Sequence, residues 1–368
     1  MKTIRRIGLI LAGLIIGLLI AEGLARLVLP KPTRQIALIR ARAPDLQMDA
    51  GTDVKNPGYN PFLQRRPSSE WTCDGKTSET MNNEGFRDRL FQIEKAPGKK
   101  RVAIIGDSFA EGWMGPRKAA FPRALESLLG DEFEVLNFSL ANRSPLRYVA
   151  LYDRIVRKYR PDSVLVCLYQ NDMAEDEILR PYVKFDAREA PDSFDYARYF
   201  RNTPRMPQTW MEKRLDRLQW KLCLYSRLFP YAAVYFTVDA EHRRRSLEMP
   251  SPDSLDALWK NTAGYLLALR ELARRDQALF LLAYAPDQSE FAAPNPLRAR
   301  ARQLASENQI PFFGAEKFLA EARYAAFYLP EDGHFSAEGH RRYAVELAEW
   351  IRPLISHGSL TCEKCGLR

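Results

Sequence analysis

Three apolar runs of this 368-residue chain each end in polar residues that can take part in catalysis. Gly106-Asp107-Ser108 follows the first run, Asn142 lies shortly after the second, and Asn171 follows the third. In an open α/β sheet, ligands bind beyond the carboxyl ends of the strands. If the three runs are strands of such a sheet, a hydroxyl group and two amides meet at one edge.

A fourth polar segment stands just before the last amphipathic stretch of the chain. It contains two acids, Glu331 and Asp332, and then His334. A serine hydroxyl, a histidine base, an acid close to that histidine and amide donors for an oxyanion are a sufficient set for acyl transfer. The sequence therefore contains every group that a serine hydrolase needs.

Each of these segments also has an ordinary structural explanation. Gly-Asp-Ser is a common turn, and a single histidine near a helix start is usually structural. Four such segments at the ends of consecutive elements, in order, are much harder to obtain by chance. A nucleophile-elbow hydrolase is disfavoured, because Ala110 stands where the second glycine of the GxSxG motif belongs.

Apolar runs alternate with stretches of helical spacing from about residue 100 onward. Strands that are continuous apolar runs are typical of a parallel sheet covered on both faces. We therefore predict an α/β fold, built as a three-layer α/β/α domain with a parallel sheet. The predicted strands are Val102–Ile105, Phe133–Phe138, Ser163–Tyr169, Ala278–Ala285 and Ile310–Phe313.

The first thirty residues favour a membrane-targeting segment. An apolar run from Ile7 to Ala21 resumes after Glu22 and continues to Leu29. We favour an uncleaved N-terminal transmembrane helix, because residues 7–29 approach the roughly 20 that a bilayer core requires. The alternative is a cleaved signal, for which the small residues around Glu22 are suitable. In the first case the protein is a single-pass protein of the cell membrane, with the rest of the chain on the extracytoplasmic side.

The pattern divides the chain into four segments. Residues 1–30 are the anchor or signal, 31–98 a linker and irregular lead-in, 99–356 the α/β domain and 357–368 a tail. A helical insertion, 174–250, follows the third strand and is rich in aromatic and basic residues. For this insertion we favour a cap packed over the sheet, and an amphipathic helix on a membrane surface is the alternative.

The net charge of +9 does not indicate a nucleic-acid partner. More than half of the excess lies in residues 1–34, and the remainder has no dense basic run, zinc-finger spacing or RNP-like motif. Five cysteines are too few and too scattered for a disulfide framework. The pair Cys362 and Cys365 is typical of a tail feature, which a disulfide would fit, and is a weak signal for zinc.

The polar segments resemble those of the SGNH or GDSL hydrolases, specifically their membrane-anchored bacterial members. The resemblance extends from about Asn82 to Trp350. Its most specific stretches are VAIIGDSFAEG at 102–112, VLNFSLAN at 135–142, LYQND at 168–172 and DGHFSAEGH at 332–340. Upstream, residues 82–87 are similar to the N-x-x-G-F-R element that often precedes the catalytic core in the anchored members. The resemblance implies a flavodoxin-like SGNH hydrolase fold.

The resemblance also implies a role for each matching residue. Ser108 is the nucleophile and its backbone N–H an oxyanion donor, Asn171 supplies a side-chain oxyanion donor, and His334 is the general base. We prefer Asp332 as the acid of the triad, because its short side chain suits a base two residues away. Glu331 stays an open alternative, since many members place the acid three residues before the histidine.

Two positions depart from the family pattern. Asn142 stands where the family has the glycine whose N–H is the third oxyanion donor. Asn tolerates positive φ better than other non-glycine residues, so we expect this donor to survive the exchange. Gln170 replaces a frequent glycine before Asn171 and adds bulk there. Asp107 is expected to fix the turn rather than to act as a catalytic acid.

The activity implied is that of a serine esterase or acyl hydrolase acting outside the cytoplasm on ester-linked acyl groups of envelope glycans or lipids. It would proceed through an acyl-serine and need no metal or organic cofactor. An O-acyltransferase using the same acyl-serine is one alternative, if water is excluded. A catalytically silent envelope binding or assembly protein is the other. The expected partners are an ester substrate and, through the N-terminal helix, the membrane.

Overall fold

The structure is a computed structural model of the whole chain, and a subset of its residues is described below. These residues are 2–29, 63–65, 67–71, 79–185, 187, 191–195, 198, 218, 222, 225–237, 252–291, 295–321, 323–330 and 333–356. Several predictions concern residues outside these ranges. They include the triad acids Glu331 and Asp332, the tail cysteines and most of the insertion.

The chain forms two units. The helical unit comprises residues 1–46 and 197–251, and the α/β unit comprises residues 47–196 and 252–368. The α/β unit is therefore built from two separate stretches of sequence, and so is the helical unit. Each is described by itself.

Five parallel strands form the sheet of the α/β unit, in the order β4-β3-β5-β8-β9. The strands are β3 (Lys100–Gly106), β4 (Phe133–Asn137), β5 (Ser163–Leu168), β8 (Leu279–Tyr284) and β9 (Phe312–Phe313). All five correspond to predicted strands, which confirms the α/β class and the parallel sheet. Strands of this kind are apolar throughout because helices cover both of their faces; all six residues of β5 are buried.

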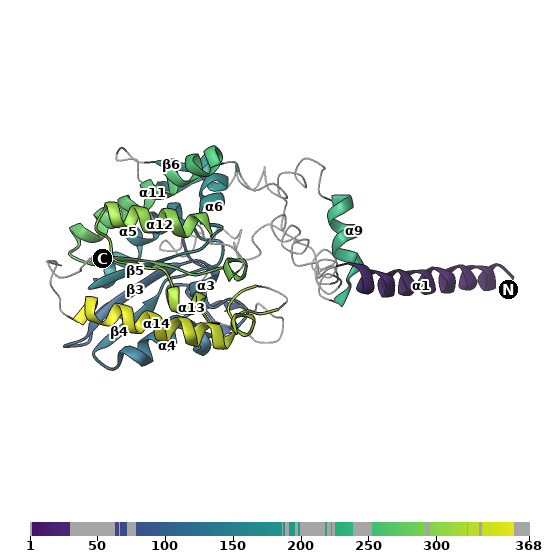
Figure 1. Cartoon of the computed structure of the whole chain (residues 1–368), viewed down its shortest axis with the longest axis horizontal. Coiled ribbons are helices and arrows are strands. Elements are labelled where there is room, and N and C mark those ends of the chain that lie inside the picture. The colour runs from purple at the N-terminus through teal and green to yellow at the C-terminus, as the bar shows by residue number, and fades with distance from the viewer. Residues whose placement is uncertain are drawn as a thin grey trace. The chain divides into compact units, whose positions relative to one another are not determined.

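Helices flank the sheet on two sides (Figure 1). Helices α5, α11 and α12 lie over one face, and α4 and α14 lie over the other. The α-helices of this unit are α3 (Ser108–Glu111), α4 (Phe121–Leu129), α5 (Pro145–Arg154), α6 (Asp172–Leu179), α11 (Pro252–Arg275), α12 (Pro296–Glu307), α13 (Glu316–Leu319) and α14 (Ala337–Ser356). The 3-10 helices are η1 (Arg117–Ala119), η2 (Val156–Tyr159), η3 (Arg180–Tyr182), η4 (Gln288–Phe291) and η5 (Tyr324–Phe327). Together they complete three layers, α/β/α.

A continuous apolar core joins the sheet to α4 and α14. Alternate strand residues point into it, such as Val102 and Ile104 of β3, because successive side chains of a strand face opposite sides. Leu125 of α4 and Leu347 of α14 meet them and are fully buried. This packing holds β3, the interior strand that leads to Ser108, in a fixed position.

Two short antiparallel pairs lie outside the main sheet. They are β1 (Glu70–Trp71) with β2 (Glu79–Thr80), and β6 (Val183–Phe185) with β7 (Pro191–Phe194). The β6–β7 hairpin falls inside the segment predicted as a helical insertion, so that segment is not helical throughout. Strands of three and four residues carry too little alternation of apolar and polar residues to be predicted.

The helical unit contains α1 (Lys2–Val28) and α9 (Leu228–Thr237). The Glu22 carboxylate of α1 accepts hydrogen bonds from the N–H groups of Arg227 and Leu228, at 2.7 and 3.1 Å. The Glu22 side chain thus satisfies backbone N–H donors at the start of α9, which would otherwise lack partners. In the part of the chain that is described, no helix combines the length and the apolar character needed to cross a membrane.

The N-x-x-G-F-R element is a compact loop, which side-chain hydrogen bonds of Asn82 stabilise. The Asn82 Oδ1 atom accepts hydrogen bonds from the N–H groups of Glu84 and Phe86, both at 2.9 Å, and its Nδ2 donates to the Arg89 carbonyl at 2.9 Å. Gly85 has φ +80°, and a Cβ built there would lie 1.9 Å from the Arg65 carbonyl oxygen. Glycine is therefore required at this position for two reasons, its backbone angle and the close approach of a second chain segment.

We predict that Gly85→Ala lowers the free energy of unfolding by more than about 3 kcal/mol, because backbone must move to admit the methyl group. Gly98 is the matched control: its φ is +75°, and a Cβ there meets nothing within 4 Å. Gly98→Ala should therefore cost only the backbone strain, about 1–2 kcal/mol. Urea unfolding of both variants measures the difference, and equal losses would contradict the close approach.

Candidate active site

The candidate site lies where the sheet changes direction. From β3 the chain moves to β4 on one side, and it then returns to β5 on the other side of β3. Loops that leave two neighbouring strands in opposite directions open a crevice at the carboxyl ends of those strands. Ser108 follows β3 and Asn171 follows β5, so both predicted residues stand at this crevice.

Ser108 and His334 are in hydrogen-bond contact. The His334 Nε2 atom lies 2.7 Å from the Ser108 Oγ atom, although 226 residues separate them in sequence. Backbone hydrogen bonds close the turn that presents the histidine: the Leu329 N–H donates to the His334 carbonyl at 2.8 Å, and Tyr328 pairs with Phe335. The predicted nucleophile and base are therefore brought together.

Aromatic rings surround the imidazole of His334. The ring of Phe109 lies 4.8 Å from it and that of Trp113 lies 6.3 Å from it, measured between centroids. Phe109 also stacks on Tyr169, whose ring centroid is 4.0 Å away. These rings give the reacting serine and histidine an apolar flank, which strengthens electrostatic interactions within the site.

The second histidine of the DGHFSAEGH stretch, His340, has a structural role. It is buried, and its Nδ1 atom accepts a hydrogen bond from the Phe121 N–H at the start of α4, at 3.3 Å. Burial lowers the pKa of His340 to about 3, so the ring is neutral and suited to accept this bond. Of the two histidines in this motif, His334 contacts Ser108, and His340 packs in the interior.

Asp107 fixes the turn, as predicted. Its Oδ1 atom accepts a hydrogen bond from the Phe109 N–H at 3.0 Å and so caps the start of α3. The Ser108 hydroxyl contacts two groups: the Asp107 Oδ2 atom, to which it can donate at 3.3 Å, and the His334 Nε2 atom at 2.7 Å. The contact with His334 is the shorter of the two, and shorter hydrogen bonds are generally the stronger ones.

Two neighbouring carboxyl groups lie below the site. Burial raises the pKa of Asp107 to about 6, although the Phe109 N–H and His334 partly offset this effect. Burial and the negative charge of Asp107 raise the pKa of Asp172 well above its ordinary value. Burial and the neighbouring Asp107 charge therefore favour the neutral form of the Asp172 carboxyl group.

Two backbone N–H groups are available as oxyanion donors. Ser108 is the first residue of α3, and Asn142 has φ +56°, which confirms the expected left-handed conformation. Within the described ranges, neither the Ser108 N–H nor the Asn142 N–H has a hydrogen-bond acceptor. A donor without a protein acceptor is suited to the negative oxygen of a substrate.

The Asn142 loop is held from both sides. Arg147 and Arg143 donate to the Asn142 carbonyl oxygen at 2.8 and 3.2 Å, and both guanidinium side chains are almost fully buried. On the other side, the Ala141 N–H donates to the Glu111 carboxylate at 2.7 Å. Charged groups therefore hold the peptide units on both sides of the one that presents the Asn142 N–H.

Asn171 is positioned by a neighbour on its own helix. Its Nδ2 atom donates to the Glu175 Oε1 atom at 2.5 Å, one helical turn along α6. One of the two amide hydrogens is thereby used, and the other remains for a substrate oxygen. Glu175 was not predicted; an acid four residues after an asparagine at a helix start was the available signal.

Arg87 secures the carboxyl end of α3. The buried guanidinium donates to the Gly112 carbonyl at 2.5 Å and to the Gly115 carbonyl, while its Nε donates to Glu79 at 2.6 Å. The last carbonyl groups of a helix lack internal partners, and a cationic donor there is favourable. The N-x-x-G-F-R element therefore acts on the helix that starts with Ser108.

A buried ion pair joins the lead-in to the same helix. Arg65 forms two hydrogen bonds with the Glu111 carboxylate, and the side chains are 6% and 0% exposed. The same carboxylate accepts from Ala141, so one charge links the lead-in, α3 and the Asn142 loop. This pair was not predicted, since Arg65 lies in a stretch without periodicity, 46 residues before Glu111.

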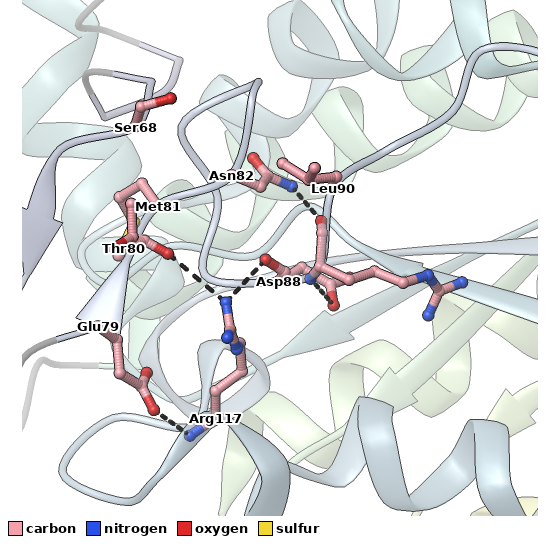
Figure 2. Close-up of a pocket in the computed structure, with 9 residues that line it drawn as sticks. Ser68, Glu79, Thr80, Met81, Asn82, Asp88, Leu90 and Arg117 are labelled. Atoms are coloured by element: carbon pink, nitrogen blue, oxygen red, sulfur yellow. Dashed lines mark hydrogen bonds between the residues drawn. The ribbon is translucent and has the colours of Figure 1, made fainter.

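A separate cavity of about 420 Å³ lies beside the lead-in, away from Ser108 (Figure 2). Arg117 crosses it and donates to the Asp88 carbonyl at 3.0 Å, and its backbone N–H donates to Glu79 at 2.9 Å. Asn82 donates to the Arg89 carbonyl on the same wall. No histidine lines the cavity beside the Ser68 and Thr80 hydroxyl groups, so it is not a second candidate active site.

The chain is similar in structure to several solved proteins, at low identity. TesA is 12% identical, with a TM-score of 0.40, and the match covers 69% of this chain and 99% of that one. The lipase/acylhydrolase from Enterococcus faecalis is 11% identical, with a TM-score of 0.37 and coverage of 70% and 97%. The acetyl xylan esterase AlAXEase is 13% identical, with a TM-score of 0.38 and coverage of 68% and 98%.

No protein-family profile matches the sequence, and no curated protein sequence does. The contacts of the site itself must carry the functional conclusion.

We predict that Arg65→Met lowers the free energy of unfolding by about 3–5 kcal/mol, because it leaves the buried Glu111 without its charge partner. The double variant Arg65→Met/Glu111→Gln should recover part of this loss. Lys317→Met is the control, since Lys317 and Glu349 are 72% and 58% exposed and such surface pairs contribute little to stability. Urea unfolding measures all three, and an Arg65→Met variant as stable as the Lys317→Met variant would contradict the prediction.

Proposed function

We propose that this chain is a serine esterase of the SGNH type, which hydrolyses ester-linked acyl groups through an acyl-Ser108 intermediate. One observation carries the proposal: the His334 Nε2 atom lies 2.7 Å from the Ser108 Oγ atom, in a crevice at the carboxyl ends of the central strands. A nucleophile with a base at hydrogen-bond distance is the signature of covalent catalysis by serine. Available N–H donors on Ser108 and Asn142 supply the second requirement.

The first half of the reaction acylates Ser108. His334 Nε2 takes the hydroxyl proton while Oγ attacks the carbonyl carbon of the ester, which becomes a tetrahedral oxyanion. The Ser108 N–H, the Asn142 N–H and the Asn171 side chain donate to that oxyanion. When the intermediate collapses, the bond to the alcohol breaks, and the alcohol leaves with the proton from His334.

The second half releases the acyl group. A water molecule gives a proton to His334 and attacks the acyl carbon, and the same donors hold the second oxyanion. Collapse returns the proton from His334 to Ser108 and frees the carboxylic acid. The neutral imidazole needed at the start of each half requires an acid that orients its Nδ1–H, and we keep Asp332 in this role, with Glu331 as the alternative.

The proposed substrates are acyl esters of envelope glycans or lipids, and the proposed location is the outer side of the cell membrane. The support is the apolar run from Ile7 to Leu29 in the sequence, which approaches the length that a bilayer core requires and follows three basic residues.

We predict that a fluorophosphonate probe labels Ser108 in the purified full-length protein, because the probe reacts with a serine activated by a neighbouring base. Ser108→Ala and His334→Ala should each abolish labelling, whereas the exposed Ser127→Ala control should retain it. Peptide mapping identifies the labelled residue. Equal labelling of the wild type and Ser108→Ala would refute the proposed esterase.

The two candidate acids can be ranked by activity. Asp332→Asn should lower the rate of ester hydrolysis by up to about 10⁴-fold if Asp332 orients and charges the histidine. Glu331→Gln, its matched control, should have a small effect. Steady-state kinetics on a soluble ester measure both, and the reverse ranking would assign the role to Glu331.

The proposed location predicts the behaviour of a fusion protein. A reporter that is active only outside the cytoplasm, fused after Arg368, should be active and should sediment with membranes. Cell fractionation and N-terminal sequencing provide the measurements. Recovery of a soluble species that begins near Leu24 would show a cleaved signal, and an inactive reporter would place the α/β unit in the cytoplasm.

A further inference from the structure

The two units of the chain carry opposite net charges. The helical unit has 19 lysines and arginines against 7 acidic residues, a net charge of +12. The α/β unit has 36 against 39, a net charge of −3. All of the excess positive charge of the protein therefore belongs to the unit that does not contain the Ser108 site.

The same basic unit exposes many large apolar side chains. In α1 the exposed fractions range from 57% to 84%. These residues are Ile15, Ile16, Leu18, Leu19, Ile20, Leu24, Leu27 and Val28. Exposed apolar residues at this density indicate an interaction surface rather than a face in contact with water.

A second apolar stripe belongs to the insertion. Leu218, Leu222 and Tyr225 are each helical, and their spacing of four and three residues in the sequence is typical of one face of a helix. Their exposed fractions are 52%, 39% and 72%. In the sequence, the basic residues Lys213, Arg214, Arg217, Lys221 and Arg227 accompany this stripe. An apolar face beside lysines and arginines is typical of a helix that lies in a lipid interface.

Hydrogen bonds join the end of this stripe, at Tyr225, and the residues that follow it to α1. Arg26 donates to the Tyr225 carbonyl at 2.7 Å, and the Ser226 hydroxyl donates to the Glu22 carboxylate at 2.7 Å. The Arg227 and Leu228 N–H groups donate to the same carboxylate, and Arg26 pairs with it at 2.8 Å. Glu22 is the single acid of α1, and these four donors satisfy it, so it can lie near lipid at a reduced cost.

We propose that the helical unit docks on a bilayer that contains anionic lipids, with Leu218, Leu222, Tyr225 and α9 on the membrane surface as a second attachment beside α1. The apolar stripe enters the acyl boundary, and the basic residues meet the lipid phosphates. This goes beyond the proposed esterase activity, because it requires neither Ser108 nor His334. A nucleic acid would pair with the charge but would leave the exposed leucines and isoleucines in water, so the lipid surface is favoured.

Amide hydrogen exchange of the full-length protein tests the docking. The Ser108→Ala protein is placed in nanodiscs of phosphatidylcholine alone or of phosphatidylcholine with phosphatidylglycerol, so that hydrolysis is excluded. Exchange in residues 218–237 should be at least about 10-fold slower in the anionic nanodiscs, and high salt should reduce the difference. Equal exchange in the two lipids, or equal protection by duplex DNA in lipid-free detergent, would overturn the proposal.

Two variants distinguish the role of the apolar stripe from the general effect of placing an aspartate at an exposed leucine. Leu218→Asp/Leu222→Asp should remove the protection of residues 218–237 in anionic nanodiscs. Leu128→Asp is the control, because Leu128 of the α/β unit is 40% exposed, close to the 39% of Leu222. Loss of protection in the control, or its retention in the double variant, would overturn the proposal. Fluorophosphonate labelling of the same substitutions in the protein with Ser108 intact reports separately on the proposed function.

Glu22→Ala tests the link between the helices. Without lipid, the amides of Arg227 and Leu228 should exchange faster in this variant, because their acceptor is gone. Glu22→Gln keeps an oxygen acceptor and should stay close to the wild type. Unchanged exchange in Glu22→Ala would show that α9 is not capped by α1 and would overturn the attachment of the stripe beside it.

Discussion

Helix α3 is only four residues long, and this constraint governs the site. A single helical turn gains almost no stability from its own hydrogen bonds, so Ser108 would not keep a fixed position on α3 alone. Asp107 caps its start, Arg87 binds the carbonyl groups at its end, and the Arg65–Glu111 ion pair ties its last residue to the lead-in. The nucleophile is held from outside its own helix.

The same constraint explains why a segment without regular structure is part of the domain. The lead-in contributes Arg65 and Arg87, whose guanidinium groups are buried against α3. A buried charge is costly unless every hydrogen bond is made, and here the partners are carboxylate and carbonyl groups of α3 and of the turn that follows it. The lead-in is therefore a structural support of the site rather than a passive connection between the N-terminus and the sheet.

The sequence was sufficient to predict those features whose residue pattern has few possible structural explanations. The continuous apolar run at Val102–Ile105 predicted β3, and the positions of Ser108 and His334 next to predicted elements, with the family resemblance, predicted a contact that the structure contains. It was insufficient where the meaning of a residue depends on a distant partner. Arg65 resembles any surface arginine until Glu111 is placed beside it, and the β6–β7 hairpin is too short to have a pattern.

The separation of 226 residues between Ser108 and His334 has a consequence for synthesis of the protein. Ser108 leaves the ribosome long before its base, and the strands β8 and β9 that complete the sheet are also made late. Contacts so distant in sequence form late in folding, because the intervening chain must first be closed. In the proposed mechanism, a nascent or truncated chain therefore carries an inactive serine, because His334 is not yet beside it.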